Sequence, residues 1–376
     1  MQFPRTSILC RNLRPGGRRV RAPGHPLNPL ESRLEYPFGE ALPLSGKKLT
    51  VAPGVDWIRK PLPFALDHIN LWLLRDRFDG RDGWTAIDCG VGLEATRTAW
   101  DKVIADELEG LPIVRVLCTH THPDHLGNAG WLTARFEAPL WMTLGEYAMG
   151  RVLQAGMTGT DGPGIVGHFR AHGMNDAAHL EKLGERTNYF SRLVPEMPAA
   201  FRRIHAGEEI AIGDRNWRVI PGFGHSPEHA ALFAHDGAIL ISGDMLLPRI
   251  STNISVHAME PEANPLQQFL DSIDRFGALP ETTLVLPSHG RPFRRLHERV
   301  LQLHQHHEDR LAEVLALCRV PTTARDVVPV MFRRELDAHQ LFFAFGEALA
   351  HLHALWYAEQ VVRERGADGI YRFAQA

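Results

Sequence analysis

Cysteine is scarce in this sequence, and neither sign of charge dominates it. The 376 residues include four cysteines and no C-x-x-C pair, so neither a disulfide framework nor a cysteine-based zinc site is expected. Lys and Arg number 41 against 44 Asp and Glu, a net charge of −3, so the whole chain is not a polycation of the kind that binds nucleic acid. No run approaches the ~18 consecutive apolar residues of a membrane span. We therefore expect a cytoplasmic protein that does not contact a membrane.

Residues 1–35 differ from the rest of the chain in charge and in turn-forming residues. Seven arginines against two glutamates give this segment a net charge of +5, and Pro and Gly interrupt it repeatedly. No apolar segment typical of a secretory signal follows it. We expect a flexible basic arm over the surface, with organelle targeting or anion binding as the alternative role.

From about residue 49 the pattern changes to short apolar runs of strand length, with helical patterns between some of them. Many strands mixed with helices predict a layered α/β domain over residues 36–293. The predicted strands are Ile69–Leu74, Trp84–Ile87, Ile113–Cys118, Pro139–Met142, Trp217–Ile220, Ala230–Ala234, Ala238–Ile241 and Thr283–Leu286. The predicted helices are Glu94–Leu108 and Pro265–Phe276.

Residues 144–204 interrupt this pattern and are rich in Gly and Met. Asn175 is a plausible N-cap for a helix that runs to about Leu193. We interpret the segment as a helical insertion over one end of the core domain. It is either an adaptable substrate lid or an ordinary packed insertion.

Residues 294–376 form a third region with a helical pattern. Helices are predicted over Leu296–Leu317, from Thr322 or Thr323 to Val330, and over Asp337–Gln360. A hairpin follows, with strands Val361–Arg365 and Ile370–Phe373. Three helices and a terminal hairpin indicate a winged-helix-like domain. Eleven Arg balance eleven acidic residues there, so we expect a wall of the active site or a homodimer contact rather than a nucleic-acid surface.

Four potential metal ligands follow the predicted strand Ile113–Cys118 within six residues: His120, His122, Asp124 and His125. Alternation along the chain lets the first two imidazoles point to one side, while the last two groups turn away as a helix begins. One cation cannot comfortably take all four groups from so tight a turn, but two neighbouring cations can share them. Imidazole and carboxylate without thiolate suit zinc, and also iron or manganese.

Three further candidates lie downstream, each just after an apolar strand: His225, Asp244 and His289. Small or turn-forming residues flank each of them, which lets the backbone approach an ion closely. A single histidine is usually structural. Several histidines and aspartates that all lie at strand ends, four of them in one short segment, favour a metal centre.

The segment His120-Thr121-His122-Pro123-Asp124-His125 resembles the H-x-H-x-D-H signature of the metallo-β-lactamase-fold hydrolases. His225, Asp244 and His289 match the later ligand motifs of that family in the right order, and Asp88 lies in a segment similar to its early Asp-x-Gly motif. The resemblance covers roughly residues 50–293. It implies a four-layer αβ/βα sandwich with a binuclear site between two sheets.

The resemblance also implies roles for these residues. One metal would bind His120, His122 and His225, and the other would bind Asp124, His125 and His289. Asp244 would bridge the two ions, with a hydroxide between them, and Asp88 would orient the site without binding a metal. Asp124 and Asp244 are therefore the expected catalytic carboxylates, and two divalent ions, zinc first and iron or manganese as alternatives, are the expected cofactors.

The expected activity is hydrolysis of an ester-like bond in a small-molecule substrate. Thioesters come first, because the histidine-rich segment resembles that of the glyoxalase II branch of the family. The C-terminal region resembles the winged-helix tail of a branch that includes an endoribonuclease and thioesterases. A phosphodiesterase or endoribonuclease, a lactonase or β-lactamase, and a non-catalytic metalloprotein are the alternatives.

Histidines outside these motifs are interpreted as structural. His304, His306 and His307 are predicted to lie on a solvated helix face, with a second metal cluster that includes His297 as the alternative, and His351 and His353 on a helix surface or an interface. His229 is expected either to line the pocket or to make a local hydrogen bond. Cys89 and Cys118 are expected to be buried thiols at strand ends.

Overall fold

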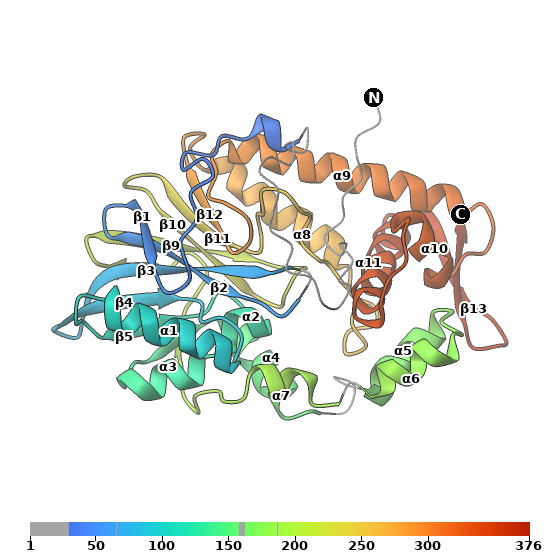
Figure 1. Cartoon of the computed structure of the whole chain (residues 1–376). Helices are drawn as coiled ribbons and strands as arrows, with labels where there is room; N and C mark the ends of the chain where they lie inside the picture. Colours follow the sequence, from blue (N-terminus) through green and yellow to red (C-terminus); the bar gives the residue numbers. More distant parts are fainter. Residues whose placement is uncertain (1–29, 65, 158–161, 186) are drawn as a thin grey trace.

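The structure is a computed structural model that describes residues 30–64, 66–157, 162–185 and 187–376. Two β-sheets lie face to face, with helices on the outer face of each (Figure 1). Within the described residues, no helix is both long enough and apolar enough to cross a membrane.

The larger sheet has seven strands in chain order; the first four are antiparallel, and β4 to β7 are parallel. Its strands are β1 (Lys48–Ala52), β2 (Val55–Pro61), β3 (His68–Phe78), β4 (Arg81–Ile87), β5 (Ile113–Leu117), β6 (Leu140–Met142) and β7 (Arg202–Arg203). The smaller sheet has the order β12-β11-β10-β9-β8. Its strands are β8 (Glu209–Ile212), β9 (Arg215–Gly222), β10 (His229–Ala234), β11 (Ile239–Gly243) and β12 (Leu284–Pro287). All eight predicted strands are confirmed, whereas β1, β2, β7 and β8 were not predicted.

The two sheets pack through apolar side chains that alternate along the strands. Trp57 and Trp72 of the larger sheet meet Trp217 and Leu232 of the smaller one in this buried layer. Indole and branched aliphatic side chains remove large apolar areas from water, which is the main stabilising contribution to such a layer. This layer fixes the sheets relative to each other, and therefore fixes the strand ends from which the candidate ligands come.

One buried ion pair also connects the sheets. Arg115 on β5 donates to the Asp76 carboxylate on β3 at 2.7 Å, and the same guanidinium group donates to the carbonyl of Ala211 in the other sheet at 2.7 Å. Asp76 also accepts the backbone N–H of Gly213 at 3.0 Å. Burial lowers the pKa of Arg115, and the carboxylate of Asp76 opposes that shift. The pair therefore aligns the two sheets as well as neutralising its own charges.

Helices cover both outer faces and complete the four layers. The larger sheet is covered by α1 (Glu94–Asp106) and α3 (Ala129–Phe136), and the smaller sheet by α8 (Pro265–Asp274) and α9 (Leu296–Leu317) (Figure 1). A short helix, α2 (Pro123–Leu126), follows β5, and the 3₁₀ helices η1 (Glu31–Arg33) and η2 (Arg275–Ala278) complete this part of the chain. The predicted four-layer fold is confirmed.

The segment 144–204 is helical, as predicted, but its described residues form four helices. They are α4 (Leu144–Gln154), α5 (Gly162–Ala171), α6 (Ala177–Gly184) and α7 (Tyr189–Leu193). The prediction of one helix from Asn175 to Leu193 is wrong: Asp176 is the N-cap, and α6 ends at Gly184. A Cβ atom on Gly162 would lie 2.5 Å from the Gly184 carbonyl oxygen, so the backbones of α5 and α6 approach closely where α6 stops.

The C-terminal region contains α10 (Ala324–Met331), α11 (Ala338–Tyr357) and a hairpin of β13 (Val361–Arg365) and β14 (Tyr371–Gln375). With α9, this gives the predicted three helices and hairpin. Thr323 and Asp337 form capping boxes at the starts of α10 and α11. Figure 1 shows α5 and α6 beside this region, and stacking of Phe169 on Phe345, with ring centroids 4.3 Å apart, joins the insertion to α11.

The described end of the predicted basic arm is packed against the rest of the chain. Glu31 is buried, the Leu30 carbonyl accepts a hydrogen bond from Gln302 of α9, and Glu35 pairs with Arg294 in an isolated β-bridge. The prediction of a flexible arm is therefore wrong for residues 30–35, because this stretch has apolar and polar partners on α9. Residues 1–29 lie outside the described residues.

Candidate metal centre

The candidate ligands all lie at the ends of strands along one edge of the two sheets. Four of them follow β5 and enter α2, while His225 follows β9, Asp244 follows β11 and His289 follows β12. Gly224, immediately before His225, has φ +90°, and a Cβ atom there would lie 2.2 Å from the Pro265 carbonyl oxygen. Only glycine permits this backbone path, which directs His225 toward the ligands from the other sheet.

The structure brings all seven predicted ligands together in two adjacent groups. His120, His122, His225 and Asp244 form one group, and Asp124, His125 and His289 form the other; within each group the ligand atoms lie within 4.8 Å of one another. The Nε2 atom of His120 lies 2.9 Å from Nδ1 of His122 and 3.2 Å from Nε2 of His225. Nε2 of His289 lies 3.4 Å from a carboxylate oxygen of Asp124.

Asp244 lies between the two groups. One of its carboxylate oxygens is 3.4 Å from Nε2 of His225, in the first group. The other oxygen is 3.5 Å from Nε2 of both His125 and His289, in the second group. A carboxylate placed in this way can contact two neighbouring cations at once.

Hydrogen bonds from the other ring nitrogen fix the tautomer of several of these histidines. Nδ1–H of His225 donates to the Asn253 carbonyl at 2.7 Å, and Nδ1–H of His289 donates to the His68 carbonyl at 2.8 Å. Because a carbonyl oxygen can only accept, each Nε2 keeps its lone pair directed into the centre. Nδ1 of His125 likewise lies 2.8 Å from the Asp88 carboxylate.

Asp88 is held in place by Thr119, the residue before the histidine-rich segment. The Thr119 backbone N–H donates to Asp88 at 2.7 Å, and its hydroxyl group lies 3.0 and 2.9 Å from the two carboxylate oxygens. Nδ1 of His120 lies 3.1 Å from the same hydroxyl oxygen. Asp88 does not belong to either ligand group, so its position agrees with an orienting role.

The donor set fits divalent cations. The Nε2 atoms of His120 and His225 both present lone pairs, and they repel each other at 3.2 Å unless a cation lies between them. Nε2 of His125 and one oxygen of Asp244 are buried 3.5 Å apart, too far for a good hydrogen bond, and an ion bound by both would satisfy them. Burial, together with the neighbouring imidazoles, lowers the pKa of His120 well below its usual value, which keeps this ligand neutral as metal binding requires.

Comparison with known proteins identifies the family. Residues 65–289, more than half of the chain, match the model of the metallo-beta-lactamase superfamily. The chain belongs to this superfamily. Residues 311–376 match the metallo-beta-lactamase-like C-terminal domain, so the helical tail is also a feature of relatives.

Several superfamily members match most of the chain. A beta-lactamase domain protein from Burkholderia ambifaria is 52% identical, and its solved structure has a TM-score of 0.88, covering 93% of this chain and 100% of its own. A metallo-beta-lactamase family protein from Thermus thermophilus is 29% identical, with a TM-score of 0.70 and coverage of 87% and 100%. A probable metallo-hydrolase, YqjP, from Bacillus subtilis (strain 168) is 23% identical over 342 residues, 84% of this chain and 96% of that protein. These matches make the chain a metallo-hydrolase of the superfamily.

Sequence reasoning missed Glu146, a buried carboxylate on α4 that connects two ligand-bearing loops. Its oxygens accept the backbone N–H of Thr121 at 2.8 Å, the hydroxyl group of Ser226 at 2.6 Å and the backbone N–H of Glu228 at 2.7 Å. Burial raises the pKa of Glu146, and these hydrogen bonds oppose that shift. Nothing in the sequence around Glu146 identifies these partners, because they lie in distant segments.

His229 is also part of the support of the centre. It is buried, and its Nε2 lies 3.3 Å from the backbone N–H of Asp244, to which it can be a hydrogen-bond acceptor. A Cβ atom on Gly243 would lie 2.2 Å from that imidazole, so the residue before Asp244 has to be small. Of the two roles expected for His229, the structure favours the local hydrogen bond.

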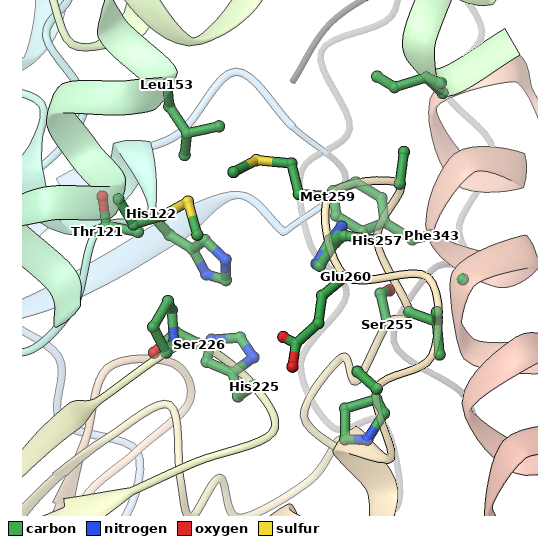
Figure 2. A pocket seen from close by; sticks show the side chains of 18 of the residues that line it. Thr121, His122, Leu153, His225, Ser226, Ser255, His257, Met259, Glu260 and Phe343 are labelled. Carbon is green, nitrogen blue, oxygen red and sulfur yellow. The ribbon is translucent and has the colours of Figure 1, made fainter. Parts of the chain in front are cut away.

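A cavity of about 470 Å³ opens beside His122 and His225 (Figure 2). Its walls come from α4, α5 and α7 of the insertion, from the loop between β11 and α8, and from α11 of the C-terminal domain. Gly346 of α11 contacts that loop directly, since a Cβ atom there would lie 2.6 Å from the Ser255 hydroxyl oxygen. The expectation that the tail forms a wall of the site therefore agrees with the structure.

One prediction about histidines outside the centre is wrong. His307 is buried, not solvated, and its Nδ1 lies 3.3 Å from Nε2 of His351. His351 and His353 are buried as well, which agrees with the interface that was one of the two positions expected for them. These residues lie where α9 and α11 pack against neighbouring elements, and the buried positions Val300, Leu303, His307, Arg310 and Val314 follow helical spacing. The two cysteines near the centre, Cys89 and Cys118, are buried thiols as predicted.

Proposed function

We propose that this metallo-hydrolase cleaves an ester-like bond, with thioesters as its first substrate class. The observation that carries the proposal is the position of Asp244 between two ligand groups, the first of which lines the cavity through His122 and His225. His120, His122 and His225 would hold one divalent ion, Asp124, His125 and His289 a second, and Asp244 would contact both. Zinc is the proposed metal, with iron or manganese as alternatives. Ions held there would supply Lewis acidity toward a carbonyl group and toward water.

The remaining contributions come from the residues of the chain. Asp88, Asn253 and the His68 carbonyl keep three imidazoles in the tautomer that directs Nε2 inward. Glu146 keeps the loops that carry His122 and His225 at a fixed separation. The apolar walls of the cavity limit the access of water around a bound substrate, which strengthens electrostatic interactions with its carbonyl group.

The charge of the cavity lining favours a small, uncharged substrate and disfavours a phosphodiester. Among the lining residues that the structure describes there is no Lys or Arg, whereas a phosphate-binding site should be basic. The C-terminal domain that forms one wall has balanced charge. We therefore propose thioesters and lactones as substrate classes ahead of phosphodiesters, including RNA.

The test is a substrate panel with thioesters, lactones and phosphodiesters, combined with elemental analysis of the purified protein. We expect thioester hydrolysis that disappears after removal of the metal and returns when zinc, iron or manganese is added. Asp124→Ala should abolish activity while the protein stays folded by circular dichroism. Full activity in metal-free protein, or turnover of phosphodiesters alone, would show that the proposal is wrong.

A further inference from the structure

The cavity beside the metal centre is lined mainly by apolar side chains. Met149 and Leu153 of α4, Ile165 of α5, and Phe342 and Phe343 of α11 line it. Figure 2 shows Leu153, Met259 and Phe343 facing the same space as His122 and His225. One end of the cavity therefore carries the metal-binding imidazoles, and apolar side chains line much of the remaining wall, together with Ser255, His257 and Glu260.

Charge is confined to one place on this wall. Among the described lining residues, Glu260 is the one Asp, Glu, Lys or Arg, and it lies on the loop between β11 and α8. Its side chain extends into the space between His225, Ser255 and His257 (Figure 2). A carboxylate in the mouth of an apolar cavity repels an anionic group and leaves a neutral one unaffected.

We propose that the cavity binds an uncharged, apolar acyl group, and that Glu260 discriminates against acyl groups that end in a carboxylate. The inference rests on the proposed function, because it assigns the acyl part of the ester-like substrate to this space. The reacting carbonyl group would lie at the end that carries His122 and His225, and the acyl chain would extend toward Leu153 and Phe343. Binding there would remove the hydrocarbon chain from water without burying a polar group, and removal of apolar surface from water favours binding.

Hydrolysis of a series of thioesters of one uncharged thiol, N-acetylcysteamine, measures the chain-length preference. With acyl groups of two, four, six and eight carbons, kcat/KM should rise about four-fold per methylene until the cavity is full. Leu153→Asp should remove this rise, because it places a charge on the apolar wall. Leu144→Asp is the matched control: it makes the same change on the same helix, at a side chain that is 44% exposed and does not line the cavity.

Comparison of pentanoyl with glutaryl thioesters measures the role of Glu260, because the two acyl groups have the same length and differ by a terminal carboxylate. The wild-type protein should prefer pentanoyl. Glu260→Gln should lower the ratio of kcat/KM for pentanoyl to kcat/KM for glutaryl by about three-fold. Glu260→Lys should lower this ratio by about ten-fold, because lysine replaces repulsion by attraction at an exposed position. The quantity compared is the ratio of kcat/KM for the pentanoyl ester to that for the glutaryl ester, so an effect of either variant that is common to both esters cancels.

A binding experiment separates this inference from the proposed function. Octanamide, which cannot be hydrolysed as a thioester, is titrated calorimetrically into the zinc-loaded protein and into both leucine variants. Octanamide should bind the wild-type protein and Leu144→Asp, but not Leu153→Asp, and acetamide should bind none of them. Binding without hydrolysis of any thioester supports the cavity assignment and overturns the thioester proposal. Hydrolysis that is independent of chain length, or a preference for pentanoyl that is unchanged in Glu260→Lys, overturns the cavity assignment and leaves the proposed function intact.

Discussion

Replacing Glu146 tests whether a residue outside both ligand groups holds the centre together. Glu146→Ala leaves three buried or partly buried donors, from Thr121, Ser226 and Glu228, without their acceptor. Each unpaired buried donor costs about 1–3 kcal/mol, and the alanine side chain is too small to fill the space. We expect a loss of about 3–5 kcal/mol in the free energy of unfolding, the upper range for a single substitution.

The same change should weaken metal binding. The loops that carry His122 and His225 approach each other through the Glu146 carboxylate, so its removal lets them separate. Supporting residues of this kind typically contribute about 10–100-fold to metal affinity. Glu146→Gln should have a smaller effect, because the amide keeps one acceptor oxygen while its NH₂ group faces a donor.

The assays are urea unfolding of the metal-free protein, followed by circular dichroism, and zinc titration against a chromophoric chelator. Glu181→Ala, on an exposed position of α6, is the control, and it should change neither result by more than about 0.5 kcal/mol. A loss of stability in Glu146→Ala below about 1 kcal/mol, with unchanged zinc affinity, would refute the reasoning.

Three further substitutions test other parts of the structure. Asp88→Asn should reduce zinc affinity about 10–100-fold in chelator competition, because His125 loses the carboxylate that orients its ring. Asp76→Ala should lower the free energy of unfolding in urea by about 3–5 kcal/mol, because it leaves Arg115 buried without its partner. Burial lowers the pKa of Lys60 from 10.5 to about 7. Between these two pH values the unfolded chain binds more protons than the folded one, so the free energy of unfolding should rise with pH. Lys60→Met should remove about 2 kcal/mol of that rise between pH 7 and 9.

Each of these predictions has a control and an outcome that contradicts it. Asp82 is an exposed carboxylate on β4, the strand that ends just before Asp88, and Asp82→Asn should keep the wild-type zinc affinity. Equal losses of zinc affinity in Asp82→Asn and Asp88→Asn would contradict a specific role for Asp88. Replacing both members of the pair, Asp76→Leu with Arg115→Met, should recover most of the stability, and no recovery would contradict the unpaired-charge explanation. An unchanged pH profile in Lys60→Met would show that Lys60 is not responsible for the rise.

The parts of the fold that the sequence predicts are those with a long or repeated pattern. The bounds Leu296–Leu317 of α9 match the prediction, because a helix of 22 residues shows its period many times. Strand β1, with four of five residues only partly buried or exposed, has no clear alternation and was missed. The break after Gly184 was missed because it depends on the approach of α5, which no local pattern reveals.

The same distinction holds for the candidate site. The adjacent ligands from His120 to His125 can be recognised because four of them lie in one short segment. The Glu146 carboxylate binds groups on distant loops, and Asn253 acts through its backbone carbonyl, so neither role leaves a signal in the local sequence. His307 could have been placed correctly, since it occupies the same helical stripe as Val300 and Leu303.

The walls of the cavity and the ligands of the metal centre come from different parts of the chain. The ligands lie at strand ends of the sandwich, whereas the apolar walls come from the insertion, one loop and α11. Changes at the cavity-lining positions of α5 and α11, and at Met149 and Leu153 of α4, can therefore alter which molecules enter without disturbing the coordinating groups. Directed evolution aimed at those positions, with Glu146 kept, is thus a practical route to new selectivities from an unchanged reactive centre.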